Sequence, residues 1–137
     1  MDHPAFETCS VERAAVVRAP DGATVRPLAA LAGQGSLAQF ELPPGGVSAA
    51  VSHATVQEIW QVTQGTGRIW RRQDGREEVT ELRPGTVLTV PLGTAFQFRA
   101  DPDSPPLQIT AVTMPPWPDD DAEARPEQGP WTANLAH

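Results

Sequence analysis

The sequence of 137 residues contains no lysine and no tyrosine, and it has a single cysteine. Without lysine and tyrosine, the chain cannot form a Schiff base, attach pyridoxal phosphate or use a tyrosine as an acid catalyst. The lone Cys9 excludes an internal disulfide and every site that needs several cysteines, such as an iron–sulfur cluster. Histidine and carboxylate side chains therefore remain as the main candidates for chemistry.

Positive charge is also scarce. The ten basic residues are all arginine, and seventeen acidic residues give a net charge of -7. A nucleic-acid backbone would be repelled by this balance, so we expect no nucleic-acid partner. No apolar run approaches the ~18 residues that cross a bilayer, and the N-terminus lacks a charged-then-apolar signal. We expect a soluble, cytoplasmic protein without membrane contact.

Short strand-like segments separated by glycine and proline make up most of the chain, and no internal repeat is visible. Only Arg26–Gly33 predicts a helix, of about two turns. We therefore expect an all-β fold, a sandwich or closed barrel, with a jelly roll as the natural candidate. The predicted strands cover residues 14–19, 36–42, 47–52, 57–64, 67–73, 77–82, 87–90, 95–99 and 107–114, with a hairpin turn at Asp74-Gly75.

The chain is predicted to form a single domain with two extensions. Residues 1–12 show no periodicity and are expected to be a lead-in to a barrel over residues 13–114. The tail, residues 115–137, holds five prolines and the acidic run 119–121. Such composition is typical of solvated segments, but Trp117 and Trp131 would lose burial energy in water. We therefore expect the tail to pack on the barrel or on a partner subunit.

His53 is the only histidine that lies far from the chain ends, and Glu58 follows it five positions later. In one uninterrupted strand these two side chains would point to opposite faces. They converge only if residues 54–57 turn or bulge, so that His53 ends one strand and Glu58 begins the next. Beyond the turn, alternation places Trp60 and Val62 on the same face as Glu58.

This region resembles the first motif of the cupin superfamily, in which Gly, His-x-His, Glu and Gly follow one another at set spacings. Gly46, Val51-Ser52-His53, Glu58 and Gly65 match it, with one residue fewer after Gly46 and Val51 in place of the first histidine. A second motif matches over residues 85–100, with Phe96 and Ala100 in place of its histidine and asparagine. The resemblance spans about residues 36–114 and implies a small, single-domain cupin barrel of the jelly-roll type.

Where the family binds a metal, the resemblance implies three histidines and one glutamate as ligands. Only His53 and Glu58 remain here, which is a degenerate site, and catalytic metal sites need at least three protein ligands. We expect no cofactor, with a divalent iron, nickel, manganese or zinc ion at His53 and Glu58 as the alternative.

Without a metal, a histidine beside a carboxylate is an acid/base pair, in which the carboxylate favours the protonated ring. The predicted function is isomerisation, elimination or cyclisation of a bound hydrophobic or aromatic metabolite, with His53 and Glu58 as the catalytic residues. Two alternatives stay open: a non-catalytic module that binds or senses a ligand, and a metal-dependent oxygenase or lyase with an incomplete ligand set. In a further interpretation, His53 and Glu58 only hydrogen-bond each other and hold a strand junction.

The expected ligand site is lined by apolar and aromatic side chains. Its predicted members are Gln39, Val51, Trp60, Val62, Trp70, Phe96 and Phe98. Cupins often pair barrel to barrel, and an outward Ile59 would need cover, so the resemblance implies a homodimer. The arginine-only composition, rich in alanine, proline and glycine, resembles that of bacteria with GC-rich genomes and suggests secondary metabolism.

Overall fold

The computed structural model describes residues 3–135 of the chain and contains eleven β-strands. The strands are β1 (Val17–Arg18), β2 (Thr24–Leu31), β3 (Gly35–Leu42), β4 (Val51–His53), β5 (Gln57–Gln64), β6 (Gly67–Gln73), β7 (Arg76–Leu82), β8 (Val87–Val90), β9 (Ala95–Ala100), β10 (Leu107–Met114) and β11 (Ala124–Pro126). Two 3-10 turns, η1 (Val11–Arg13) and η2 (Asp121–Glu123), are the only helical elements in this range. None of the helical structure in this range is long and apolar enough to span a membrane.

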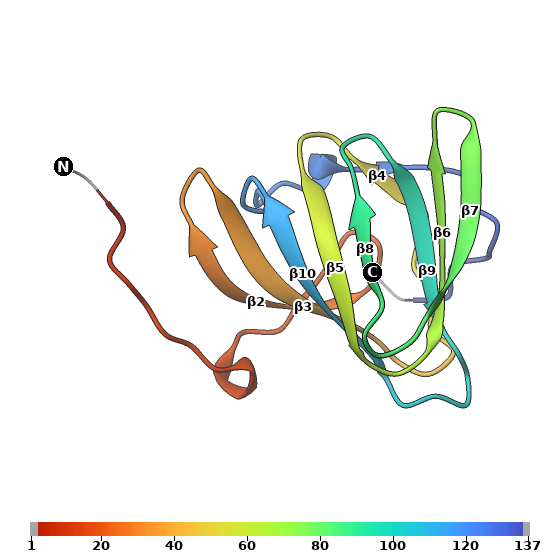
Figure 1. Cartoon of the computed structure of the whole chain (residues 1–137), viewed down its shortest axis with the longest axis horizontal. Helices are drawn as coiled ribbons and strands as arrows, with labels where there is room; N and C mark the ends of the chain where they lie inside the picture. Colours follow the sequence, from red (N-terminus) through yellow and green to blue (C-terminus); the bar gives the residue numbers. More distant parts are fainter. Residues whose placement is uncertain (1–2, 136–137) are drawn as a thin grey trace.

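The strands form two antiparallel sheets. One sheet has the order β1-β2-β3-β10-β5-β8 and the other the order β11-β4-β9-β6-β7. Figure 1 shows these sheets curving around a common interior, with the N-terminal segment extending away from them. This is the all-β, jelly-roll architecture predicted from the sequence.

The interior is filled by the inward faces of both sheets. On β5, buried Glu58, Trp60 and Val62 alternate with exposed residues, as the sequence pattern predicts. Trp60 is the centre of an aromatic group, because its ring makes edge contacts with Phe40, Phe96 and Phe98 at centroid distances of 5.6, 5.5 and 5.0 Å. Such edge-to-face packing is favourable beyond the apolar area that it buries.

The predicted helix over residues 26–33 is wrong, because this stretch forms β2. Alanine and leucine gave the segment its helical character, but pairing with β3 along its length overrides that local preference. Pro27 has no N–H to donate, and the register with β3 shifts between Pro27 and Ala29. Strand β1 pairs only with Thr24 and Val25, so Pro27 lies in a part of β2 that has a partner strand on one side only, where a proline is tolerated.

Other predicted boundaries are also revised. The segment 14–19 contributes only the two-residue β1, and the predicted strand over residues 47–52 is replaced by the shorter β4. Val47 instead makes an isolated bridge with Arg99. The hairpin predicted at Asp74-Gly75 joins β6 to β7.

Gly65 directly follows β5, at the position of the last glycine of the first cupin-like motif. Its φ is +82°, and a Cβ atom there would lie 2.8 Å from the carbonyl oxygens of both Pro105 and Pro106. Any other residue would therefore combine backbone strain with a clash against the loop that leads into β10. The motif glycine thus reflects a close approach of two backbone segments.

The described part of the C-terminal segment, residues 115–135, lies against the barrel. Strand β11 pairs with β4, and Gln97 of β9 bonds the backbone of Trp131 twice, through its Nε2 and its Oε1. A Cβ atom at Gly129 would lie 2.3 Å from Gln97 Oε1, so the chain passes the barrel too closely for a side chain. The last two predicted tail residues, 136–137, and the first two lead-in residues, 1–2, lie outside the described range.

Candidate active site

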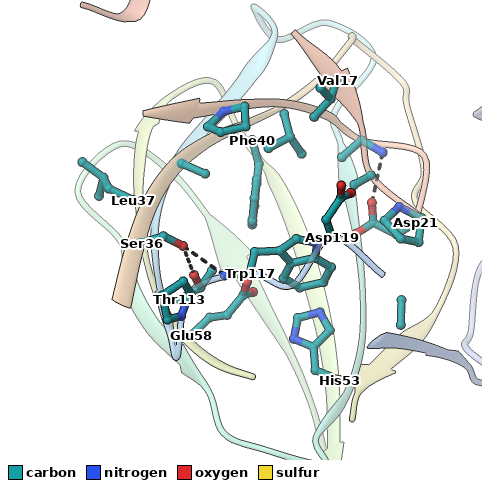
Figure 2. Close-up of a pocket in the computed structure, with 18 of the residues that line it drawn as sticks. Val17, Asp21, Ser36, Leu37, Phe40, His53, Glu58, Thr113, Trp117 and Asp119 are labelled. Atoms are coloured by element: carbon teal, nitrogen blue, oxygen red, sulfur yellow. Dashed lines mark hydrogen bonds between the residues drawn. The ribbon is translucent and has the colours of Figure 1, made fainter. Parts of the chain in front are cut away.

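A cavity of about 580 Å³ opens between the two sheets. One part of its wall is apolar and comes from β2 and β3, including Val25, Ala38 and Phe40. The cavity is also lined by polar side chains, among them Ser36 of β3, Thr113, His53 and Glu58, and by Trp117 of the C-terminal segment. In Figure 2 the Glu58 carboxyl group and the His53 ring both point toward the Trp117 ring.

Glu58 lies at the start of β5 with its side chain on the inward face, and only 2% of the residue is exposed. Its Oε1 accepts a hydrogen bond of 2.9 Å from Trp60 Nε1, whereas its Oε2 is buried without a hydrogen-bond partner. Burial raises the pKa of Glu58 to about 8, because a charged carboxylate would lose its hydration. The hydrogen bond from Trp60 opposes this rise, and the negative charges of Asp21 and Glu123 add to it.

His53 ends β4 and is 6% exposed. Its ring makes edge contacts with Phe96 and Trp117, at centroid distances of 5.2 and 5.0 Å, and its buried Nδ1 has no hydrogen-bond partner. Burial lowers the pKa of His53 to about 4, and the negative charge of Glu123 offsets only part of this effect. The prediction that a neighbouring carboxylate keeps the His53 ring protonated is therefore wrong, because the loss of hydration outweighs the nearby negative charge.

Burial therefore moves the two pKa values in opposite directions, that of His53 downward and that of Glu58 upward. Near pH 7, His53 is neutral and can accept a proton, while Glu58 is protonated and can donate one. Neither His53 Nδ1 nor Glu58 Oε2 is used in a hydrogen bond between the two residues, because both atoms lack a partner. The interpretation in which the pair only holds a strand junction through a mutual hydrogen bond loses its main support.

The turn expected between the two residues is present. Strand β4 ends at His53 in one sheet, and β5 begins at Gln57 in the other. Residues 54–56 therefore carry the chain from sheet to sheet. Glu123 lies beside this connection and accepts hydrogen bonds from the backbone amides of Thr55 and Val56.

The other predicted ligand-binding residues divide between the cavity and the surrounding structure. Val51 and Phe96 line the cavity. Trp60, Val62 and Phe98 belong to the hydrophobic core, where Trp60 acts on the site through its bond to Glu58. Gln39 accepts a hydrogen bond from Arg26, and Trp70 packs in a separate cluster with Ala50, Ala95 and Trp131.

Sequence reasoning missed several residues that the fold brings to the cavity, and most of them come from the N-terminal strands and the C-terminal segment. They include Ser36, Thr113, Asp21, Trp117 and Asp119, all shown in Figure 2. The Trp117 amide donates to Ser36 Oγ at 3.2 Å, and Ser36 Oγ in turn bonds Thr113 Oγ1. The one available signal was the presence of an isolated tryptophan in a polar tail, which predicts an anchored ring but not a ligand-facing one.

Residues 18–116 match the family model of the cupins (Cupin_1), so the chain belongs to the cupin family. No curated protein sequence matches it. Among solved structures, a Streptomyces PAC13 variant with uridine superposes with a TM-score of 0.70 at 11% identity, covering 97% of this chain and 95% of that one. Another structure describes Pac13 as a nucleoside dehydratase, with a TM-score of 0.68 at 10% identity and the same coverage of both chains.

Two further structures illustrate how widely this architecture is used. KdgF from Halomonas sp. has a TM-score of 0.68 at 16% identity, covering 84% of this chain and 97% of that one. The coconut allergen cocosin has a TM-score of 0.61 at 23% identity, covering 77% of this chain but 29% of that one. At these identities the likeness establishes a common fold and no more.

The residues at the expected metal position do not fit a metal ion. The described residues contain no group of three or more His, Cys, Asp and Glu side chains that could hold one. Val51 and Phe96, which stand where the family pattern has histidines, are register partners on β4 and β9 and line the cavity with His53 and Glu58. Only two possible ligands, His53 and Glu58, remain, whereas catalytic metal sites use at least three protein ligands. The reaction proposed for this protein therefore uses no metal.

The opposed pKa shifts predict an unusual dependence of stability on pH. Glu58 binds its proton more tightly in the folded than in the unfolded protein. Its contribution to the free energy of unfolding is therefore fully present below about pH 4.5 and is lost as the pH rises through about 8. His53 binds its proton less tightly when folded, so its contribution is present above about pH 6.5 and is lost as the pH falls through about 4. Between about pH 4.5 and pH 6.5 the loss from Glu58 and the gain from His53 cancel, so the free energy of unfolding stays nearly constant.

Above pH 6.5 the effect of Glu58 dominates, and the free energy of unfolding should fall by about 1–1.5 kcal/mol up to pH 8. Urea unfolding at pH 6.5 and pH 8 measures this loss. Glu58→Gln cannot ionise and should remove it, whereas Glu7→Gln, at an exposed carboxylate, should leave it in place. Equal losses in wild type and Glu58→Gln would contradict the assignment of a buried, protonated Glu58.

Proposed function

We propose that this cupin binds a small hydrophobic or aromatic metabolite and catalyses proton transfer on it without a metal, with His53 as the general base and Glu58 as the general acid. One observation carries the proposal. His53 Nδ1 and Glu58 Oε2 are the two buried side-chain atoms between residues 3 and 135 that lack a hydrogen-bond partner, and both residues line one cavity. Buried polar groups are normally satisfied, so a ligand that accepts from one and donates to the other is the natural partner.

The protonation states support the direction of proton flow. In an elimination, neutral His53 Nδ1 would take a proton from a carbon next to a carbonyl group, and the released electron pair would form a carbon–carbon double bond. The neighbouring carbon–oxygen bond would break, and the departing hydroxyl would take the Glu58 proton and leave as water. Return of a proton from the imidazolium to the carboxylate, directly or through water, restores both groups.

The same pair could serve an isomerisation, in which the abstracted proton is returned to a different atom, or a cyclisation. Among these reactions, elimination has additional support from the fold, because Pac13, described as a nucleoside dehydratase, has this architecture. That support is an analogy of fold, and the chemistry of this chain depends on its own residues.

The cavity wall supports an apolar or aromatic ligand. Phe40, Phe96 and Trp117 line it together with small aliphatic side chains of β2 and β3. A flat ring would pack on these surfaces, while its polar substituents would reach the end of the cavity that holds Ser36 and Thr113. The volume of about 580 Å³ is sufficient for a metabolite of this kind.

A cytoplasmic homodimer of a bacterial secondary pathway is part of this proposal. Ile59 of β5 and Val112 of β10 are register partners on the outer face and are 42% and 38% exposed. Adjacent exposed apolar residues on one sheet favour a contact with a second copy, in line with the pairing that many cupins show.

The test uses the small molecule that co-purifies with the protein. Incubated with the protein in deuterated water, this molecule should acquire deuterium at a carbon position or convert to a product lighter by one water, as measured by mass spectrometry and proton NMR. His53→Gln protein should bind it without exchange. Binding without exchange or conversion by wild-type protein would instead identify a non-catalytic module, and loss of activity on metal chelation would contradict the metal-independent reaction.

A further inference from the structure

Glu123 is the buried carboxylate that the proposed reaction does not use. It lies in η2, nine residues after the last barrel strand, and it is 4% exposed. We propose that Glu123 is a positioning residue, whose carboxylate clamps the connection between β4 and β5 so that His53 and Glu58 face the same cavity. This inference rests on the proposed function, because it assigns Glu123 a role in arranging the two catalytic groups.

The clamp consists of three hydrogen bonds to two consecutive residues. Glu123 Oε2 accepts from the Thr55 amide at 2.8 Å and from the Val56 amide at 3.1 Å, and Glu123 Oε1 accepts from the Thr55 hydroxyl. Hydrogen bonds to a carboxylate are stronger than those between neutral groups. Thr55 and Val56 lie between His53 and Glu58, so the clamp acts on the segment that sets their relative position.

Backbone contacts hold Glu123 itself in place. The Ala54 amide donates to the Glu123 carbonyl oxygen at 2.8 Å, and Ala124 is the register partner of His53 in the pairing of β11 with β4. The Asp120 side chain accepts from the Ala122 amide and caps the turn from which Glu123 projects. These contacts hold Glu123 in place without using its own side chain.

Within the connection, the Ala54 amide bonds the Glu123 backbone, whereas the Thr55 and Val56 amides bond the Glu123 side chain. Three residues carry the chain from one sheet to the other, so their amides leave the ladders of both sheets. A buried amide without a partner destabilises the fold, and the Glu123 carboxylate satisfies two amides at once. Without it, the connection would relax toward water and take the adjacent His53 and Glu58 with it.

The charge of Glu123 and its hydrogen bonds to the connection affect the pKa values of His53 and Glu58 differently, so these pKa values can test the proposal. The negative charge of Glu123 raises the pKa of His53 and also that of Glu58, where the charge of Asp21 acts in the same direction. Removing only the charge should therefore lower both pKa values. Opening the connection should hydrate both groups, so that the pKa of His53 rises toward 6.5 and that of Glu58 falls toward 4.5.

The experiment titrates His53 and Glu58 by NMR in the full chain, which needs no substrate. Glu123→Gln keeps an oxygen acceptor but loses the charge, and we expect both pKa values to fall. Glu123→Ala loses the clamp, and we expect the His53 pKa to rise and the Glu58 pKa to fall, with kcat for the proposed reaction reduced about tenfold or more. If Glu123→Ala moves both pKa values downward as Glu123→Gln does, the groups have kept their places and the proposal is overturned.

Glu127→Gln is the matched control. Glu127 lies in the same C-terminal segment, where it accepts a hydrogen bond of 2.7 Å from Ser52 Oγ and forms an ion pair with Arg72. This variant removes the same charge and loosens the same segment away from the clamp, so the pattern seen in Glu123→Ala should not appear. Its appearance there would show that docking of the segment in general sets the site, and would overturn the specific role of Glu123.

Thr55→Val serves if Glu123→Ala does not fold. It removes the hydroxyl donor and leaves both amide bonds, and we expect shifts in the same directions as in Glu123→Ala but smaller; unchanged pKa values would overturn the proposal. Failure of the proposed function would give a different result. His53→Gln and Glu58→Gln would then keep full turnover, while the Glu123 variants would still shift the pKa values of His53 and Glu58 as described.

Discussion

Replacing His53 by glutamine is expected to lower kcat/KM for the proposed reaction by about 10²- to 10⁴-fold, the usual contribution of a positioned general base. Glutamine has a similar polar character but cannot accept a proton from carbon. Because His53 makes no hydrogen bond through Nδ1 in the free protein, its loss should leave folding intact. The measurement is turnover of the co-purifying metabolite, with ligand affinity determined separately.

Glu58→Gln should produce a loss of similar size by a different route. The amide oxygen can still accept the hydrogen bond from Trp60 Nε1, so the packing is kept, but the proton for the leaving group is gone. Because the two residues act in one step, the double variant should be little worse than either single variant. His3→Gln, at an exposed position, is the matched control and should be fully active. Retention of more than about a tenth of the activity by either single variant would exclude that residue as acid or base.

A second large effect is expected from restoring the two histidines of the family pattern. The double substitution Val51→His and Phe96→His places two imidazoles on register partners of β4 and β9, facing the cavity that His53 and Glu58 line. With four donors available, the protein should bind about one equivalent of Zn²⁺ that survives gel filtration, whereas the wild type should retain none. Metal analysis after dialysis measures both.

The protonation states predict how this engineered binding depends on pH. Glu58 must lose its proton to act as a ligand, so affinity should rise between pH 6 and pH 8. His53 is already neutral there and needs no deprotonation. Adding His53→Ala to the double variant should abolish the binding. A wild-type protein that retains a full equivalent of metal lost in His53→Ala would contradict the metal-free assignment.

The strands of the barrel were predictable because their side chains alternate between the core and solvent. In β5 and β10, inward residues are apolar or belong to the site, and every second residue is polar or exposed. Segment 26–33 misled the prediction because its composition suits a helix, while its pairing with β3 comes from residues several positions away in the chain. Local preference could not reveal that partner.

The candidate site was predictable in part. The need for a turn between His53 and Glu58 followed from strand geometry, and β4 and β5 end and begin where that argument requires. The protonation states were not predictable, since they depend on how completely the barrel buries each group. Glu123 could not be found either, because it contacts Thr55 across 68 positions of sequence and no periodic pattern connects them.

The origin of the cavity wall has a consequence for how such a protein can diversify. Trp117 and Asp119 face the cavity, yet they come after β10, outside the strands that close the barrel. Recombination between related chains at that boundary would exchange part of the ligand-facing surface in one event and leave the scaffold untouched. Chimeras built this way should acquire new substrate preferences only if the incoming segment also brings a carboxylate to the place of Glu123.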